Sequence, residues 1–375
     1  MKIILPVYPN EIKTLKEDKY IDIYELRAES IKNISELEDV LQKLKKFGKK
    51  IIFTVRTKKE GGKIGISKVK YLEFIRSVMQ SHMTDFVDIE INTISKSELI
   101  SLVEETGYGN IIYSMHKNES SLSFDDIEKC MEDATEAKAK ILKLADRASS
   151  FEEIKKKIKV LSKKDLKFEI IYISMGEIGK FTRVRSKYYT PKYTFLTLKD
   201  RGLGQFPLSA IKKVKTENFS VVYSEIFDSS LGKIRVIADD KKVLKIEIEK
   251  FEDDLFIPIL GSNAITSLAK REISEYLSGN LKKFSVSVNM GDSNFQKRVY
   301  KHLMETGYGE LISYKELAER IGNEKSSRAV GNVMARNLIP IIIPCHRVIK
   351  SDGDLGNYRY GKDIKKKLIN LEERC

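Results

Sequence analysis

The chain has 375 residues and a formal net charge of +14, with 41% hydrophobic and 33% charged residues. This length exceeds one ordinary hydrophobic core, so we expect two domains. No run of about 18 uncharged apolar residues occurs, which excludes a membrane-spanning segment. Three unevenly spaced cysteines exclude a disulfide framework and predict a reducing, cytoplasmic location.

Short apolar runs rich in Ile, Val, Phe and Tyr recur through the first 208 residues, with amphipathic segments between them. The runs lie at residues 2–8, 20–28, 50–57, 86–91, 110–116, 140–145, 168–175 and 193–198. Eight such units, each a strand followed by a helix, predict an α/β protein with a closed (β/α)8 TIM barrel rather than an open sheet.

Ionisable side chains gather at the ends of these predicted strands, where barrels carry their chemistry. They include Glu25, Arg27, Arg56, Glu90, His116 and Lys143. A lysine desolvated there has a depressed pKa, and its free amine attacks a ketone to form a Schiff base. A nearby histidine can then move the proton of the adjacent carbon, and arginine forks bind a carboxylate. These residues predict a Schiff-base lyase acting on a small anionic hydroxy-ketone.

Motifs in residues 1–208 resemble the type I dehydroquinate dehydratase family of the shikimate pathway, which serves aromatic amino acid biosynthesis. They are YELRAE (24–29), IIFTVRTKKEGG (51–62), DFVDIEI (85–91), IIYSMH (111–116), ILKLA (141–145), MGEIGKFTRV (175–184) and GQ (204–205). The resemblance implies dehydration of 3-dehydroquinate to 3-dehydroshikimate. It makes Lys143 the imine-forming lysine and His116 the general acid/base, with Glu60 orienting the histidine.

The same resemblance assigns the substrate contacts. They are Glu25, Arg27 and Arg56 for hydroxyl groups, Arg183 for the carboxylate, and Gln205. The family loop SAPGQ is RGLGQ here, so Arg201 replaces a serine, and we expect turnover with an altered Michaelis constant. Another Schiff-base lyase, such as an aldolase, remains an alternative, although no Gly-rich phosphate loop supports it.

The pattern changes after LSAIKKVKTENFS (208–220), which predicts a short basic helix leading into a new strand. We therefore expect a barrel at 1–215 and an α+β domain at 216–375. FSVVYSEIF, GKIRVIADD and KVLKIEIE predict a small antiparallel sheet within 216–285. Residues 286–375 predict a helical subdomain. Its helices at 313–321 and 326–336 fit a helix-turn-helix and, equally on this pattern alone, an ordinary helical hairpin in a core.

The stretch IPIIIPCHRV (339–348) allows two interpretations. Cys345 is either a buried small hydrophobe or a thiol activated by a neighbouring base, His346. Adjacent side chains on a strand point in opposite directions, so activation requires a bridging water or a turn of the backbone. The two prolines favour a turn.

With its flanks, this stretch resembles the alkylguanine-DNA alkyltransferases, the methylated-DNA–protein-cysteine methyltransferases of DNA repair. The motifs are FQKRVYKHL, GYGELISYKELAERIG, SSRAVGNVMARN, IPCHRVI and GNYRYGKDIKKKLINLEE. The resemblance implies irreversible alkyl transfer from guanine to Cys345, on double-stranded DNA bound through the minor groove with little sequence preference. The further roles it implies fall to His346 (base through water), Glu372 (orienting His346), Arg328 (entering the duplex), Tyr314 (flipped guanine) and Asn337 (thiol support).

Arg359 and Tyr360 stand where many members of this family have Ser and Gly, so we expect methyl transfer but poor reaction of benzyl-sized groups. The four histidines form no metal motif, and neither CxxC nor HExxH occurs, so we expect no cofactor or metal in either site. One inactive half remains an alternative: a DNA-binding or sensor module at the C-terminus, or a barrel that only stabilises. The sequence indicates no oligomeric state.

Overall fold

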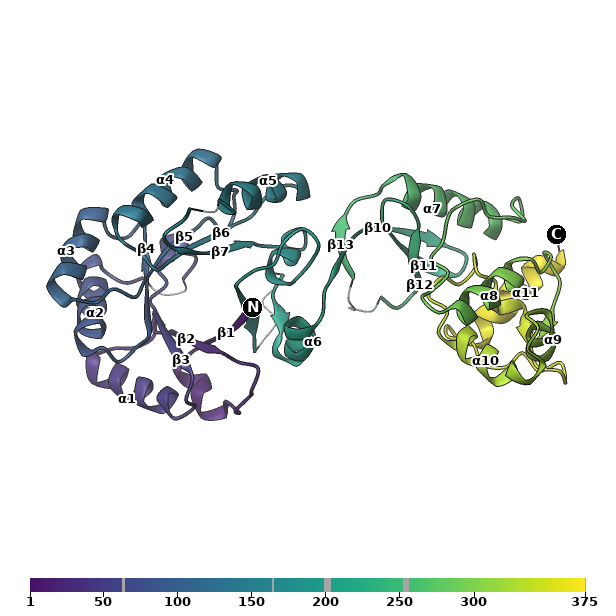
Figure 1. Ribbon diagram of the computed structural model, residues 1–375, viewed down its shortest axis with the longest axis horizontal. Helices are drawn as coiled ribbons and strands as arrows, with labels where there is room; N and C mark the ends of the chain where they lie inside the picture. The colour runs from purple at the N-terminus through teal and green to yellow at the C-terminus, as the bar shows by residue number, and fades with distance from the viewer. Residues whose placement is uncertain (63–64, 164, 199–203, 252–255, 375) are drawn as a thin grey trace. The chain divides into compact units, whose positions relative to one another are not determined.

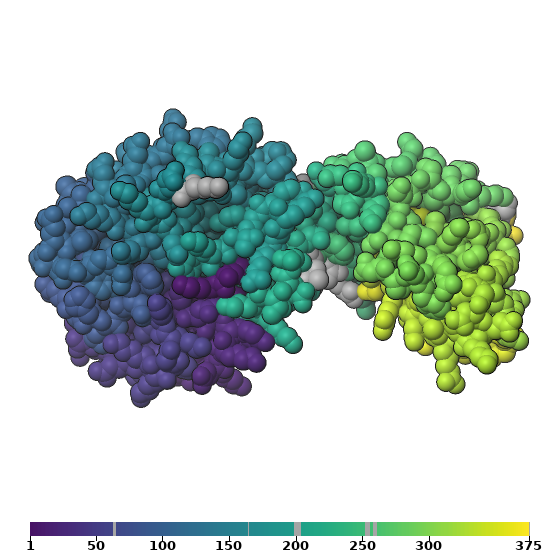
Figure 2. All heavy atoms as spheres, in the orientation of Figure 1, coloured from purple at the N-terminus to yellow at the C-terminus, as the bar shows by residue number. Residues whose placement is uncertain are grey.

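The computed structural model describes residues 1–62, 65–163, 165–198, 204–251 and 256–374. The chain divides into two compact units, Met1–Ser220 and Val221–Cys375. Figure 1 and Figure 2 colour the first unit from purple to teal and the second from green to yellow. Within the described residues, no helix is both long and apolar enough to cross a membrane.

The first unit is a curled parallel sheet with its helices on the outside (Figure 1). The strand order is β7-β6-β5-β4-β3-β2-β1-β8-β9. The strands are β1 (Lys2–Val7), β2 (Ile23–Arg27), β3 (Lys50–Thr54), β4 (Phe86–Glu90), β5 (Ile111–His116), β6 (Ile141–Asp146), β7 (Glu169–Ser174), β8 (Tyr193–Thr197) and the short β9 (Phe206–Pro207). The eight predicted strands of a TIM-barrel-like domain are therefore confirmed.

The helices of this unit follow most of the strands but not all. They are α1 (Ile34–Lys45), α2 (Lys68–Ser81), α3 (Lys96–Thr106), α4 (Phe124–Glu136), α5 (Phe151–Leu161) and α6 (Ile211–Thr216). Each of α1 to α5 begins after a residue whose side chain accepts a backbone N–H of the first turn. These caps are Asn33, Ser67, Ser95, Ser123 and Ser150.

The prediction of a helix after every strand is wrong at two places. Among the described elements, β1 is followed only by the 3-10 helix η1 (Pro9–Thr14), and β7 only by the 3-10 helix η3 (Lys180–Arg183). The connection after β7 contains Gly176, Gly179 and Pro191, which interrupt a regular helix. The shorter 3-10 helices η2 (Lys58–Glu60) and η4 (Leu208–Ala210) precede α2 and α6.

Alternation along the strands gives the barrel an apolar floor with a polar layer above it. Successive side chains of a strand point to opposite faces. The floor is a buried cluster that includes Ile4, Ile23, Ile52, Ile112, Ile141, Ile171, Tyr193 and Phe195. Two residues further along five of the strands, the same face carries Glu25, Thr54, Asp88, Ser114 and Lys143. The polar layer is therefore held over a tightly packed base.

Among the described residues, β7 and β8 are not neighbours in the hydrogen-bonded sheet. A side-chain hydrogen bond joins them instead. The Tyr193 hydroxyl of β8 donates to Glu169 Oε2 of β7 at 2.5 Å. At the other end, the backbone N–H of Ser174 donates to Thr182 Oγ1 of η3 at 3.1 Å. The 3-10 helix η3 therefore lies against the end of β7, and its Arg183 lines the pocket of the barrel.

The second unit begins with a four-stranded sheet in the order β12-β11-β10-β13. Its elements are β10 (Ser220–Ser229), β11 (Gly232–Ala238), β12 (Val243–Ile248), β13 (Phe256–Leu260) and the helix α7 (Ala264–Leu277). β11 pairs antiparallel with both β10 and β12, which confirms the predicted sheet type. β13 was not among the predicted strands.

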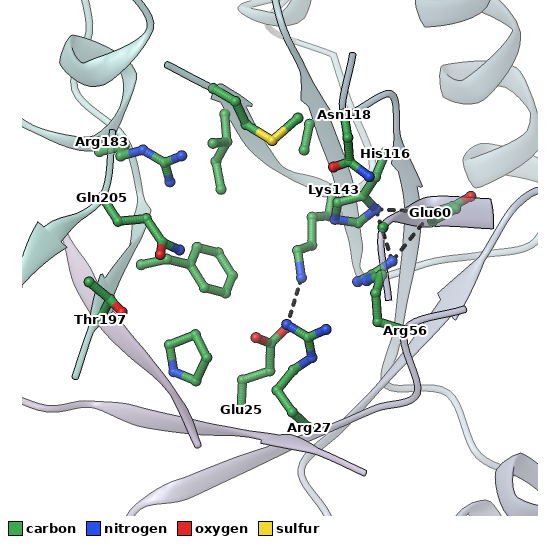
Figure 3. Close-up of a pocket in the computed structure, with 16 residues that line it drawn as sticks. Glu25, Arg27, Arg56, Glu60, His116, Asn118, Lys143, Arg183, Thr197 and Gln205 are labelled. Carbon is green, nitrogen blue, oxygen red and sulfur yellow. Dashed lines mark hydrogen bonds and ion pairs between the residues drawn. The ribbon is translucent and has the colours of Figure 1, made fainter. Parts of the chain in front are cut away.

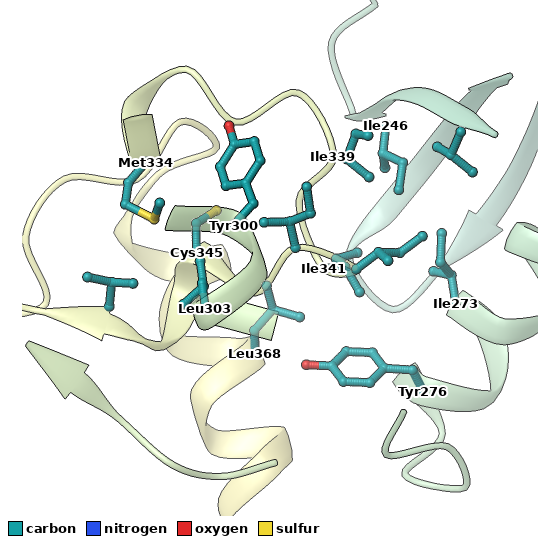
Figure 4. Close-up of a cluster of buried hydrophobic side chains, with 14 of the residues drawn as sticks. Ile246, Ile273, Tyr276, Tyr300, Leu303, Met334, Ile339, Ile341, Cys345 and Leu368 are labelled. Atoms are coloured by element: carbon teal, nitrogen blue, oxygen red, sulfur yellow. The ribbon is translucent and has the colours of Figure 1, made fainter. Parts of the chain in front are cut away.

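The remainder of the second unit is mostly helical. It comprises α8 (Asn294–Met304), α9 (Tyr314–Arg320), α10 (Ser327–Ala335) and α11 (Lys362–Arg374), the 3-10 helices η5 (Glu324–Ser326) and η6 (Cys345–Arg347), and the paired short strands β14 (Ile312–Ser313) and β15 (Val348–Ile349). One core joins it to the sheet: Figure 4 shows Ile246 and Ile273 of the sheet part with Leu303 and Leu368 of the helical part.

The three isoleucines before the cysteine lie in this core, as predicted, but in a turn rather than a strand. Ile341 has a φ of 73° and is 1% exposed. A left-handed backbone is strained for a β-branched residue, so the surrounding packing must hold it in place.

Two candidate active sites

Lys143 of β6 stands in the polar layer of the barrel. Its Nζ donates to Glu25 Oε1 at 2.9 Å and to Asp88 Oδ2 at 2.8 Å, and lies 4.7 Å from the centre of the Phe195 ring. Burial alone would raise the pKa of Glu25, but the charges of Lys143 and Arg27 outweigh it and lower that pKa. The expected apolar surroundings are therefore present only on the Phe195 side.

His116 of β5 contacts one acidic and one basic side chain, Glu60 and Arg56. Its Nδ1 lies 3.0 Å from Glu60 Oε2 and 2.9 Å from Arg56 Nη1. Arg56 also donates to Glu90 at 2.9 Å and to Asp88 at 3.1 Å. Burial lowers the pKa of His116, and the Arg56 charge lowers it further. Burial, helped by Glu90, raises the pKa of Glu60 to about 8. A neutral imidazole beside such a carboxyl group is suited to proton transfer.

The eight residues predicted for the barrel line one pocket. They are Glu25, Arg27, Arg56, Glu60, His116, Lys143, Arg183 and Gln205. Figure 3 shows Arg183 and Gln205 across the pocket from His116. Burial lowers the pKa of the Arg183 guanidinium to about 10. The planar guanidinium matches a carboxylate, with which it can form two parallel hydrogen bonds. Arg201 lies outside the described residues.

Sequence reasoning missed Asp88, which is fully buried and bonded to both Lys143 and Arg56. Its signal was available, because Phe86, Asp88 and Glu90 alternate along one face of β4. Sequence reasoning also missed Asn118 and Thr197, which line the pocket. Both follow or end a strand, in the same kind of position as the residues that were found.

In the second unit, Cys345 is the first residue of η6 and not the end of a strand. The backbone turn that the two prolines favour is therefore present. The Asn337 side chain holds this turn and the thiol together. Its Nδ2 donates to Cys345 Sγ and to the Ile343 carbonyl, both at 3.0 Å, and its Oδ1 accepts from the Ile339 N–H at 2.9 Å.

His346 is completely buried next to the cysteine and pairs with α11. Its Nε2 lies 3.0 Å from Glu372 Oε1. The Tyr276 hydroxyl of α7 donates to the same oxygen at 2.6 Å, and the Arg347 guanidinium donates to both carboxylate oxygens at 2.8 and 2.9 Å. Because a carboxylate accepts, Nε2 of His346 carries the hydrogen and Nδ1 keeps its lone pair. Tyr276 and Arg347 were not predicted.

The protonation states of this group follow from burial and hydrogen bonding. Burial raises the pKa of the Cys345 thiol and lowers the pKa of His346. Burial alone would raise the pKa of Glu372, but hydrogen bonds from His346 and Arg347 lower it. The set at neutral pH is a thiol, a neutral imidazole and a carboxylate. Through a bridging water, the imidazole can take the thiol proton when the sulfur attacks.

A second pocket opens in front of Cys345. It is lined by residues that include Tyr314, Gly331, Asn337, Cys345, Lys350, Tyr358, Arg359 and Tyr360. Tyr360 is fixed there, because its hydroxyl donates to the Ile246 carbonyl of β12 at 3.0 Å. Arg328 does not line this pocket but is exposed on α10. His346 and Glu372 lie behind the cysteine, away from the pocket lining.

The two pockets offer different reactive groups: an amine with an imidazole and carboxylates in the first, and a thiol with an imidazole behind it in the second. Over the described parts of the chain, no group of three or more His, Cys, Asp or Glu side chains could hold a metal ion.

Two family models match the chain. The family described as type I 3-dehydroquinase matches residues 8–218, and the DNA binding domain of 6-O-methylguanine DNA methyltransferase matches residues 294–374. The first model covers more than half of the chain.

Individual relatives fall into the same two groups. A methylated-DNA–protein-cysteine methyltransferase from Methanosarcina acetivorans is 38% identical over 156 residues, which are 41% of this chain and 100% of that protein. One from Methanosarcina barkeri is 40% identical over 154 residues, 40% of this chain and 98% of that protein. The crystal structure of a type I 3-dehydroquinate dehydratase from Clostridium difficile, covalently modified with comenic acid, has a TM-score of 0.51 and 22% identity. It aligns with 57% of this chain and 90% of its own, and it supports the fold of the first unit.

Proposed function

The chain belongs to the type I 3-dehydroquinase family and, in its C-terminal part, to the methylated-DNA–protein-cysteine methyltransferases, and from this premise we propose one bifunctional enzyme. Its first activity dehydrates 3-dehydroquinate to 3-dehydroshikimate. Its second transfers an alkyl group from alkylated guanine in DNA to a cysteine of the protein itself. The observation that carries the proposal is that each unit places one nucleophile, Lys143 or Cys345, at a pocket with a histidine close by.

In the barrel, Lys143 attacks the ketone carbon of the substrate and the carbonyl oxygen leaves as water. The resulting iminium withdraws electrons from the adjacent carbon, whose proton becomes acidic. His116 takes that proton and then donates one to the departing hydroxyl group. Glu60, 3.0 Å from His116 Nδ1, orients the imidazole.

The substrate is held from two sides of the pocket. Arg183 pairs with its carboxylate, and Gln205 contacts it from the same side (Figure 3). Glu25, Arg27 and Arg56 contact its hydroxyl groups. The Arg56 guanidinium also bonds to three acidic side chains of the site, so it fixes the catalytic groups as well as the substrate.

Borohydride trapping tests the barrel chemistry, because it reduces an imine to a stable adduct. Protein mixed with 3-dehydroquinate and borohydride should gain the mass of one reduced substrate at Lys143, located by peptide mapping. Lys143→Met should gain none. A sugar phosphate is the comparison substrate: an adduct formed with it, and none with dehydroquinate, would establish an aldolase instead.

In the second unit, Cys345 attacks the alkyl carbon and guanine leaves. His346 takes the thiol proton through a water molecule, and Glu372 holds His346 in the required tautomer. Asn337 stabilises the developing thiolate with a hydrogen bond of 3.0 Å. Tyr314, which lines the pocket, contacts the flipped guanine.

DNA engages the second unit through a helix-turn-helix formed by α9 and α10. Arg328 is exposed near the start of α10 and enters the duplex in place of the flipped nucleotide. The small residues Ala329 and Gly331 let this helix approach the DNA backbone closely. Small side chains on this helix offer few base-specific contacts, which supports the binding that the family resemblance implies, through the minor groove with little sequence preference.

Intact-mass analysis tests the transfer. Incubation with a duplex that carries O6-methylguanine should add one methyl group to each protein molecule, on Cys345. Cys345→Ser should bind the duplex and gain no mass. A wild-type protein that binds methylated DNA without any mass change would be a sensor module rather than a transferase.

A further inference from the structure

Asp88 holds Lys143 from below without lining the substrate pocket. It is fully buried in β4, and its Oδ2 lies 2.8 Å from Lys143 Nζ and 3.1 Å from Arg56 Nη2. Its other oxygen, Oδ1, accepts a hydrogen bond of 2.5 Å from the Ser114 hydroxyl. Both carboxylate oxygens are thus fixed. Glu25, the second carboxylate on Lys143, differs because it lines the pocket.

The Lys143 ammonium group has a different neighbour on each of three sides. It donates hydrogens to Glu25 and Asp88, and the centre of the Phe195 ring lies 4.7 Å from the nitrogen. A ketone carbon can approach the nitrogen only from the pocket, where Glu25 and Phe195 stand. The Asp88 side is closed by β4 and β5, since Ser114 of β5 lies against it.

Imine formation removes two of the three ammonium hydrogens. The ammonium nitrogen has no lone pair, so it first passes one proton to the ketone oxygen, and the resulting amine forms the C–N bond that becomes C=N. The C=O bond breaks, and its oxygen leaves as water with two hydrogens from the nitrogen. The iminium nitrogen then carries its positive charge and a single N–H, which can be donated to only one of the two carboxylates.

We propose that Asp88 is the positioning residue that keeps this last N–H, while Glu25 releases the nitrogen and turns to the substrate. This inference rests on the proposed dehydratase function. The retained hydrogen bond fixes rotation about the Cε–Nζ bond of Lys143, and therefore the plane of the C=N bond. The acidic carbon is thereby presented to His116 on the neighbouring strand. The Asp88 carboxylate also neutralises an iminium that would otherwise be a buried, unpaired cation.

The test compares Asp88→Asn with the full-length wild type by borohydride trapping of 3-dehydroquinate over a pH series. An opposite charge at this distance favours a cation by about 1–3 pKa units. Trapping should fail at high pH when the iminium nitrogen loses its N–H proton, and this alkaline limit should lie lower in Asp88→Asn by about that amount. We also expect kcat to fall about tenfold or more. Asp39→Asn, which removes an exposed carboxylate from α1, is the matched control and should match the wild type.

Glu25→Gln separates the two carboxylates. It should raise KM and leave the alkaline limit where the wild type has it, because Glu25 has left the nitrogen by then. If Asp88→Asn keeps the wild-type limit, or if Glu25→Gln moves it, the assignment to Asp88 is overturned. Where circular dichroism shows that Asp88→Asn does not fold, Glu25→Gln decides. A wild type that traps no substrate refutes the dehydratase function instead.

Discussion

The Tyr276 hydroxyl donates a hydrogen bond of 2.6 Å to Oε1 of Glu372, the oxygen that also lies 3.0 Å from His346 Nε2. Tyr276 belongs to α7, beside the sheet, whereas Glu372 belongs to α11 in the helical part. The group behind Cys345 therefore uses both parts of the second unit. Tyr276 also lies outside residues 294–374, which match the DNA binding domain of the family.

Tyr276→Phe should slow methyl transfer. A hydrogen bond to a charged group contributes about 1.5–3 kcal/mol, so we expect a rate reduced by about tenfold or more. Without this donor the Glu372 carboxylate attracts the His346 proton more strongly and raises the pKa of His346, so the acid limb of the rate profile should move to higher pH. Single-turnover rates of methyl transfer between pH 5 and 9 measure both effects. A mutant with the wild-type rate and profile would show that Tyr276 only packs.

The dehydratase rate should rise as pH increases through about 8, the pKa of Glu60. Below that pH the raised pKa keeps the carboxyl protonated. Above it, the carboxylate makes the adjacent His116 a stronger base. Glu60→Gln should lack the rise, because an amide does not ionise. Initial rates at saturating 3-dehydroquinate from pH 6 to 9.5 test this. A mutant that keeps the full rise would assign it to another group.

Arg359 and Tyr360 should restrict the alkyl pocket to small groups. Both line it, and Tyr360 is fixed by its bond to the Ile246 carbonyl. We expect methylated DNA to label Cys345 much faster than a benzylguanine probe, and the double variant Arg359→Ser, Tyr360→Gly to accelerate only the benzyl reaction. Equal labelling rates in the wild type would contradict this restriction.

Asn337→Ala should affect stability and reactivity together. It leaves the buried Ile339 N–H without its acceptor, whereas the Ile343 carbonyl loses the Asn337 bond but still accepts the Cys345 N–H at 2.8 Å. A buried group left unsatisfied costs about 1–3 kcal/mol, which lowers the Tm of the second unit by several degrees. The thiol also loses a donor that favours its thiolate, so methyl transfer slows. Calorimetry and single-turnover kinetics measure the two effects. A slower reaction at an unchanged Tm would limit Asn337 to the thiol.

Much of the barrel site can be predicted from local sequence. The carboxyl ends of the parallel strands meet at one rim, however the two edges of the sheet come together. Lys143 and His116 stand out for that reason. Asp88 is less evident: it shares a face of β4 with Glu90, but an aspartate that alternates with apolar residues also fits the outer face of a strand. Which face turns inward is decided when the sheet curls, through pairs far apart in the chain.

The second unit shows the same limit. The motif around Cys345 is local, and the sequence identifies it together with Glu372. Tyr276 contributes from about 70 residues away, as the separation between it and His346 shows. On its own helix it has the spacing of an ordinary core residue. Only the packing of α7 against the helical part directs its hydroxyl to the carboxylate.

The barrel floor and the core of the second unit are separate clusters that share no residue. A chain whose Cys345 has been alkylated therefore keeps the packing on which Lys143 depends. Repair capacity equals the number of chains that have not yet reacted, and each lesion removes one. Dehydration capacity depends on turnover by every folded chain, reacted or not. A cell that clears alkylated chains by proteolysis would lower its flux toward aromatic compounds in proportion to the damage repaired.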